Sequence, residues 1–189
     1  LGGMFAVTAL LAGVWFATFG LWARTAGAIT FPVAGIPLSA AAIVACQLRF
    51  EERPEVLSYL FLAFHLWLIG QLATGTITRR KVLAWVASQA VWTNVHGYFV
   101  LGPAVLALWL VCGSFQGQRP DRSTRGWQIL AGVSAATLVS PFGFGAWRTA
   151  FEFARYLSAM RDAILEFRTY PLSGYGWTVG FFWGWSGLV

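Results

Sequence analysis

The sequence predicts an all-α fold, a polytopic transmembrane bundle of about six to seven spans or part-spans, because about 20 apolar residues cross a bilayer as a helix. Three observations lead to this prediction. Hydrophobic residues make up 58% of the chain and charged residues only 11%, whereas soluble domains carry about 25% charged residues. The hydrophobic residues gather in long tracts separated by short charged segments. Within each tract they are continuous, as in membrane helices, and do not alternate with polar residues as in membrane barrels.

Five apolar tracts are the candidate spans. They occupy residues 1–22, 26–48, 55–75, 82–112 and 127–147. The chain begins at Leu1 inside one apolar tract and stops at Val189 inside another that is too short to span. We therefore expect a single transmembrane domain over residues 1–189, cut at both ends from a longer protein.

The loops between the tracts predict the orientation of the domain. Basic residues dominate at Arg24, at residues 79–81 and at residues 119–125, whereas acids balance the arginines at residues 49–55 and 148–168. Loops rich in lysine and arginine usually stay in the cytoplasm, so the first set is expected inside and the second outside. The net charge of +6 is therefore assigned to membrane orientation, and no nucleic acid is expected as a partner.

The tract at residues 82–112 is long enough for two shortened helices. If the basic segments at both of its ends are cytoplasmic, the tract must enter the membrane and return, with a turn between Asn94 and Gly97. The alternative is one long tilted helix, which would place the two basic segments on opposite sides. We favour the hairpin, which puts Asn94 and His96 near the outer surface, where water can reach them.

Polar side chains within the apolar tracts are the first candidates for function. Asn94 and His96 need partners, because an unpartnered polar group in hydrocarbon costs several kcal/mol. Such residues often mark functional sites, and they also act as hydrogen-bonded clamps between helices. Gln89, Thr93 and His96 would share one face of a continuous helix. His65, in the middle of the preceding tract, is either a proton-relay group or a packed imidazole.

Two segments near the end of the chain have patterns of their own. Residues 148–170 combine an apolar stripe with charges on the remaining surface, which predicts an amphipathic helix lying in the membrane interface on the outer face. The alternative is a solvated surface helix. In the last tract Gly176, Gly180 and Gly184 recur at four-residue spacing, which predicts close helix packing.

Carboxylates are scarce, with seven Asp and Glu in the whole chain. Glu51, Glu52 and Glu55 lie in the predicted outer loop, where a carboxylate near a cavity mouth could act as a general acid or base. The alternative is a solvated ion pair with a neighbouring arginine. Glu166, near the end of the predicted interface helix, could face the same cavity. The histidines and cysteines do not have the spacing of a metal site, so no metal ligand is assigned.

The stretch from Trp92 to Gly102 reads W-x-N-x-H-G-x-F-x-x-G. It resembles a signature of bacterial multi-pass membrane proteins in the GT-C class of glycosyltransferases. Two further stretches agree with this resemblance in order and spacing. They are Arg53 and Pro54 ahead of an apolar tract, and S-P-F-G at 140–143 ahead of a helix ending A-I-L-E-F at 163–167. The resemblance covers roughly residues 50–170.

The resemblance implies transfer of a sugar from a lipid-linked, polyprenyl-phosphate donor to an acceptor on the outer face of the bacterial inner membrane. The resemblance also implies a catalytic Asp or Glu in the first external loop, as is typical of enzymes of this class. No Asp precedes Asp121 here, so either Glu51 or Glu52 takes that role or the catalytic acid lies upstream of this sequence. The expected substrate-binding residues are Arg53, Asn94, His96 and Glu166. No cofactor is evident, and a divalent metal ion is left open.

A second hypothesis belongs to a different class of protein. In a multi-pass transporter or flippase-like protein, Gln89, Asn94, His96 and His65 would line a polar translocation path. An acidic pair in an upstream external loop would favour the transferase, whereas an inverted repeat in a longer chain would favour the transporter.

Overall fold

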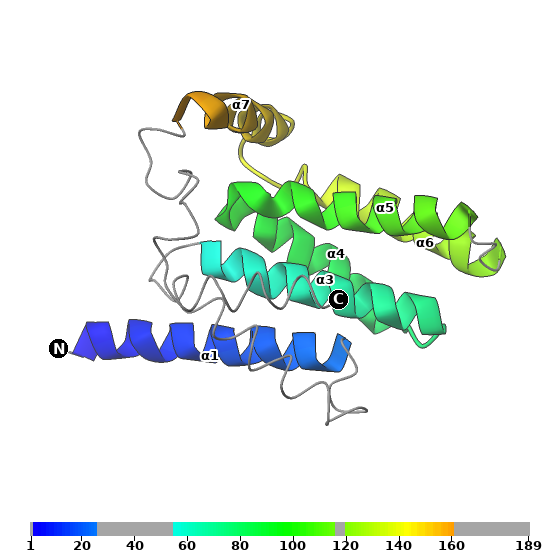
Figure 1. The fold of residues 1–189 in the computed structure, drawn as a ribbon, viewed down its shortest axis with the longest axis horizontal. Coiled ribbons are helices and arrows are strands. Elements are labelled where there is room, and N and C mark those ends of the chain that lie inside the picture. The colour runs from blue at the N-terminus through cyan, green and yellow to red at the C-terminus, as the bar shows by residue number, and fades with distance from the viewer. Residues whose placement is uncertain (1, 26–54, 116–119, 161–189) are drawn as a thin grey trace, which may run out of the picture.

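The computed structural model describes residues 2–25, 55–115 and 120–160. These residues form six α-helices and one short 3-10 helix, with no strand among them, so the predicted all-α fold is confirmed. In chain order, with the labels of Figure 1, the elements are α1 (Gly2–Thr25), α3 (Glu55–Thr74), α4 (Arg79–Val95), η2 (Gly97–Val100), α5 (Leu101–Phe115), α6 (Pro120–Ala136) and α7 (Gly145–Met160). The predicted span at 26–48 lies outside the described residues.

Two helical stretches are long and apolar enough to cross a membrane. The first is α3, and the second runs through η2 and α5 from Gly97 to Ser114. Both begin at the same end of the bundle (Figure 1). Their length and composition support association with a membrane.

The tract at 82–112 contains two helices, as the hairpin prediction requires. α4 ends at Val95, and His96 adopts an extended backbone with φ −158° and ψ 146° before η2 begins. The single long helix is therefore wrong. Pro103 lies in the first turn of α5, where its missing N–H removes no bond of that helix. α4 and α5 run in opposite senses along the bundle (Figure 1). The membrane side of each loop stays a prediction.

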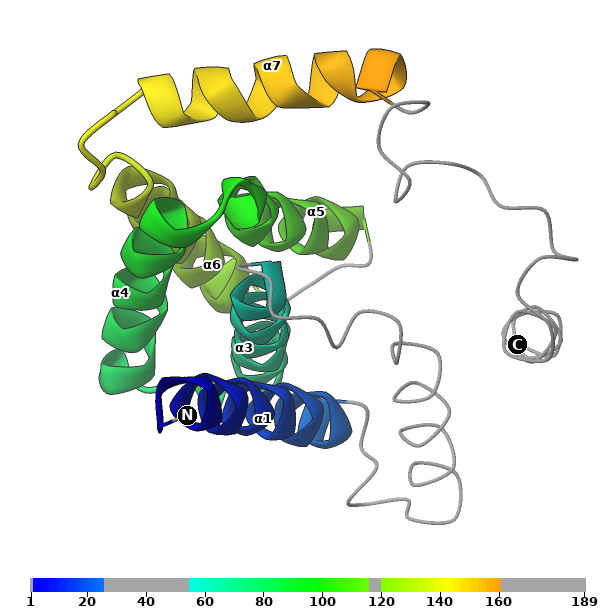
Figure 2. The same ribbon diagram turned by 90° about the vertical axis from the view of Figure 1, so that its left-hand side faces the viewer.

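α3 lies at the centre of the bundle and packs against α1, α4 and α5. α6 packs on α4 and α5 from the other side, so a shared apolar core forms among these helices. Figure 2 shows α1 on one side of this group and α7 on the opposite side. The buried core residues are Leu68, Ile69, Leu72, Ile77, Trp85, Leu106, Leu110, Ile129 and Val133.

The close approach of α5 and α6 depends on Gly126. A Cβ atom built at this position would lie 2.4 Å from Leu110 Cδ2. Real carbon atoms do not approach so closely, so a side chain here would force the two helices apart or displace Leu110. The small residue in α6 therefore sets the spacing of the helices that enclose the core.

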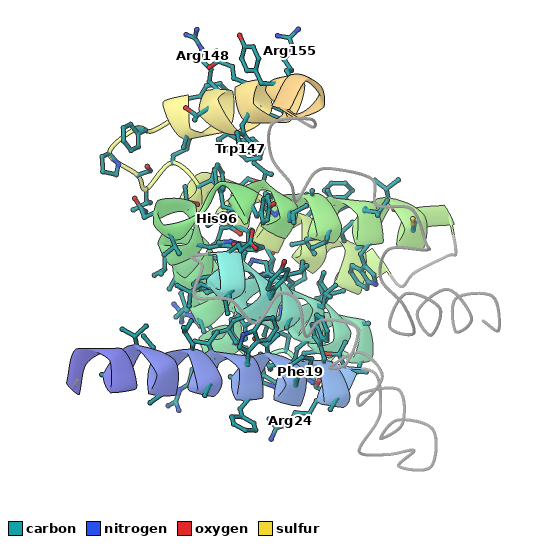
Figure 3. The ribbon with its side chains drawn as sticks, turned by 60° about the vertical axis from the view of Figure 1, so that its left-hand side comes forward. Phe19, Arg24, His96, Trp147, Arg148 and Arg155 are labelled. Carbon is teal, nitrogen blue, oxygen red and sulfur yellow. The ribbon has the colours of Figure 1, made fainter. Side chains whose placement is uncertain are left out.

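α7 covers the first part of the predicted amphipathic helix at 148–170 and begins three residues earlier, at Gly145. Trp147 points toward the bundle, where its ring meets Phe99 edge-on at 5.5 Å between centroids. Its Nε1 donates to Thr137 Oγ1 at 2.8 Å. Figure 3 shows Arg148 and Arg155 on the side of α7 that faces away from the bundle. The helix is amphipathic, while its position in a membrane interface stays a prediction.

Candidate functional site

A buried polar network ties three elements together beneath the turn between α4 and α5. His65 in α3 is fully buried, and its Nε2 lies 3.0 Å from Gln89 Oε1 in α4. The Gln89 amide nitrogen donates to the Phe99 carbonyl in η2 at 3.1 Å. The other ring nitrogen of His65, Nδ1, lies 2.9 Å from the Phe61 carbonyl one turn earlier. The network therefore fixes the relative positions of α3, α4 and η2.

Gly102 has no side chain, and the Gln89 and His65 side chains occupy the space where its Cβ atom would be. A Cβ atom at Gly102 would lie 2.0 Å from Gln89 Oε1 and 3.0 Å from His65 Nε2. The missing side chain lets the first turn of α5 approach both polar groups and exclude water from them. Gly102, the last residue of the W-x-N-x-H-G-x-F-x-x-G stretch, therefore has a packing role that the sequence spacing alone did not reveal.

Two tryptophans enclose His65. The Trp85 and Trp92 rings meet the imidazole at 5.7 Å and 5.3 Å between centroids, both in edge-to-face geometry. Trp92 is anchored by its Nε1, which donates to Ser58 Oγ in α3 at 3.0 Å. Trp85 Nε1 is buried and has no hydrogen-bond partner within the described residues. His65 is thus a packed, hydrogen-bonded imidazole, the second of the two alternatives considered for it.

Asn94 acts as a clamp at the exposed end of α4. Its Nδ2 donates to the Ala90 carbonyl at 2.8 Å and to the Val139 carbonyl at 2.7 Å. The second bond joins α4 to the segment that leads from α6 into α7. The Oδ1 atom of this exposed side chain accepts no hydrogen bond from the described residues, so it remains available to a ligand.

His96 is half-buried at the same end of the bundle (Figure 3). Its Nδ1 accepts a hydrogen bond from the Tyr98 backbone N–H at 3.3 Å, and the two rings meet edge-to-face at 4.5 Å. Nδ1 therefore carries the lone pair, and Nε2 has no hydrogen-bond partner among the described residues. Burial lowers the pKa of the imidazole, and the negative charge of Glu55 opposes that effect. A neutral imidazole at neutral pH follows.

Glu55 is the one of the three outer-loop glutamates that lies within the described residues, although sequence reasoning preferred Glu51 and Glu52 for the catalytic role. It is the first residue of α3, close enough to His96 for its carboxylate to act on the imidazole electrostatically. Glu55 follows Pro54 at the start of an apolar tract, and both residue types favour the first turn of a helix. That signal could have placed Glu55 at the end of the bundle. The packing of α3 against η2, which sets His96 beside it, has no signal in the local sequence.

The predicted site residues divide into two groups. Asn94 and His96 lie together at one end of the bundle. Gln89 and Thr93 share a helix face, with their side chains 3.5 Å apart. His96 does not continue that face, because α4 ends before it. Four predicted residues lie outside the described ranges: Glu51, Glu52, Arg53 and Glu166. The predicted packing glycines Gly176, Gly180 and Gly184 also lie outside them.

No group of three or more His, Cys, Asp or Glu side chains that could hold a metal ion occurs in the described part of the chain. The arrangement offers instead a carboxylate, a neutral imidazole with an open Nε2, and an amide oxygen. Comparisons of the chain with protein-family models, with curated proteins and with solved structures gave no significant match. The chemistry of these side chains is therefore the basis for a functional proposal.

Proposed function

We propose that this chain is the membrane-embedded part of a multi-pass, GT-C-like glycosyltransferase of the bacterial inner membrane. In this proposal it moves a sugar from a polyprenyl-phosphate donor to an acceptor on the outer face. The observation that carries the proposal is that Glu55, at the start of α3, and His96, just before η2, lie at one end of two packed elements and interact electrostatically. Both candidate spans begin at this end of the bundle, one at Glu55 and the other at Gly97. A carboxylate, an imidazole and an amide at a membrane surface suit a lipid-linked substrate.

The chemistry requires a base and a group that binds phosphate. The acceptor hydroxyl loses a proton as its oxygen attacks the anomeric carbon, and the bond from that carbon to the donor phosphate breaks. The Glu55 carboxylate would take this proton. The neutral His96 ring carries its lone pair on Nδ1 and its proton on Nε2, so Nε2 would donate a hydrogen bond to a phosphate oxygen of the donor. Asn94 Oδ1 would accept a hydrogen bond from a sugar hydroxyl. Arg53 would bind the phosphate that leaves with the lipid.

Glu51, Glu52 and Glu166 keep the roles expected for them, as alternative bases or as a substrate ligand. The transporter hypothesis receives less support from the contacts. Gln89 is fully buried, and its amide is engaged by His65, Phe99 and Thr93. A translocation path would need this side chain to face water or cargo.

Substitutions in the full-length protein test the proposal. We expect Glu55→Gln to reduce sugar transfer from a polyprenyl-phosphate donor by about 100-fold, the size of a typical acid–base contribution, and His96→Leu to reduce it because the hydrogen bond from Nε2 to the phosphate is lost. The thermal midpoint of each variant should stay near that of the unmodified protein. Glu152→Gln is the matched control, because Glu152 is exposed and paired with Arg148 on α7, and it should transfer normally. Normal transfer by both site variants would refute the assignment.

A further inference from the structure

A second site lies in a cavity between α4 and α6, near the end of the bundle opposite His96. At this end α3 and α5 finish and α4 and α6 begin (Figure 1). The cavity is open to the surface and has a volume of about 250 Å³. Its lining residues are Arg79, Val82, Val86, Arg125, Gln128, Ile129 and Gly132. Two cationic side chains thus share one cavity with an aliphatic wall.

The two guanidinium groups come from different helices and are not neutralised by the described residues. Arg79 is the first residue of α4, and Arg125 lies in the second turn of α6. Neither forms a hydrogen bond or an ion pair within the described ranges. Lys81 is different, because its Nζ bonds to Gln71 Oε1 and lies 5.3 Å from the centroid of the Trp67 ring. The cavity arginines therefore keep their hydrogen-bond donors for a ligand.

The start of α4 adds to the positive potential. Its first turn carries Arg79, Arg80 and Lys81 and no acidic residue. The N-terminus of a helix already bears a partial positive charge, so cations there repel the helix dipole unless an anion is present. A phosphate group is tetrahedral, and two of its oxygens can accept paired hydrogen bonds from one planar guanidinium group. The charge of the site points to a phosphate ligand.

The wall of the cavity identifies the source of that phosphate. Val82, Val86 and Ile129 line the cavity on the side that leads into the bundle, and they offer no polar group to a small hydrated ion. A phospholipid supplies both an anionic headgroup for the arginines and an acyl chain for the valines and isoleucine. The ends of both candidate spans lie at this level of the bundle, which is where lipid headgroups would be found.

We propose that Arg79 and Arg125 bind the phosphate of an anionic phospholipid, whose acyl chain lies along Val82, Val86 and Ile129. The site is independent of the proposed transferase centre, which lies at the other end of α4. It accounts for a basic cluster that the sequence assigned only to membrane orientation. The lipid joins α4 to α6 and stabilises their packing.

Lipid-dependent thermal stability tests this site in the detergent-purified protein. Phosphatidylglycerol should raise the thermal midpoint by about 2–4 °C, which corresponds to about 1 kcal/mol for a domain of this size. Phosphatidylcholine and inorganic phosphate should not. Arg79→Gln and Arg125→Gln should each remove the increase. Arg80→Gln is the matched control, because it removes one charge from the same helical turn without lining the cavity, and it should keep the increase.

Native mass spectrometry supplies a second measurement that does not depend on the glutamine variants folding. The unmodified protein should retain phosphatidylglycerol in preference to phosphatidylcholine, and Arg79→Lys should weaken that preference by losing the paired hydrogen bonds. Equal loss in Arg80→Gln would reduce the effect to surface charge and overturn the proposal. Equal stabilisation by inorganic phosphate would show that the ligand is a free anion and not a lipid. Equal retention of the two lipids would show that the cavity does not select an anionic headgroup. Either result would overturn the proposal.

Discussion

Two polar clusters lie near the end of α4, one around Gln89 and the other around Asn94, and they are built differently. In the inner cluster, Gln89 and His65 are fully buried, and their polar atoms lie within hydrogen-bond distance of each other and of backbone carbonyls. In the outer cluster, Asn94 is exposed and His96 is half-buried, and each keeps one polar atom without a partner among the described residues. A closed network stabilises a fold, whereas open donors and acceptors can bind a substrate. We therefore infer that the inner cluster stabilises the fold and that the outer cluster is the candidate substrate-binding site.

The largest effect is expected from adding one methyl group to the inner cluster. In Gly102→Ala, the new Cβ would overlap Gln89 Oε1 and crowd His65 Nε2. We expect a loss of about 3 kcal/mol in the free energy of unfolding, from overpacking and from broken buried hydrogen bonds. Gly70→Ala is the control, since no atom lies within 4 Å of its added Cβ. It should be neutral or stabilising. Denaturant unfolding in detergent compares the two variants, and equal stabilities would show that the network is not tightly packed.

Removing one partner of the inner network should have the next largest effect. Gln89→Leu leaves His65 Nε2 and the Phe99 carbonyl buried without their bond, at a cost of about 1–3 kcal/mol. The double variant with His65→Leu removes the orphaned imidazole as well, so it should lose less than the sum of the two single losses. A double-mutant cycle on thermal unfolding measures this coupling. Additive losses would contradict a shared network.

The outer cluster should separate stability from function. Asn94→Leu breaks the bond to Val139, so its free energy of unfolding should fall by about 0.6–2 kcal/mol. His96→Leu loses the bond from the Tyr98 N–H and the ring contact with Tyr98, both local to the turn, so it should fold nearly normally while failing to support function. Thermal midpoints and complementation in cells, measured on the same two variants, distinguish these outcomes. If the loss of function matches the loss of stability in both, the cluster is structural.

The smallest effect concerns pH. Burial lowers the pKa of His96 below its usual 6.5, with Glu55 opposing. The unfolded chain therefore binds a proton more readily than the folded protein. The contribution of His96 to stability is complete above about pH 6.5 and is lost as the pH falls through the lower, folded pKa. Glu55→Gln removes the opposing charge, so the pKa of His96 should fall further. Histidine NMR titration measures this pKa. An unchanged pKa in Glu55→Gln would show that the Glu55 carboxylate does not act on His96.

The local sequence pattern by itself predicted the helices, the turn near the end of α4 and the amphipathic helix α7. Continuous apolar tracts predict helices because burial in lipid or protein favours a backbone that satisfies its own hydrogen bonds. The length of the tract at 82–112 and the charge of its flanks predicted a turn near Asn94 to Gly97, which the structure contains. The amphipathic stripe predicted the helix now seen as α7. Each of these features depends on residues that are close together in the chain.

Only the tertiary structure decided which polar groups meet. His65 and Gln89 are 24 residues apart in the chain, and Asn94 and Val139 are 45 apart. Periodicity shows which face of a helix is buried but not which residue on another helix it contacts. That partner depends on interhelical distance and register, which here follow from small residues such as Gly102 and Gly126. For the same reason, Asn94 could be recognised as polar from the sequence, while its role as a clamp required the fold.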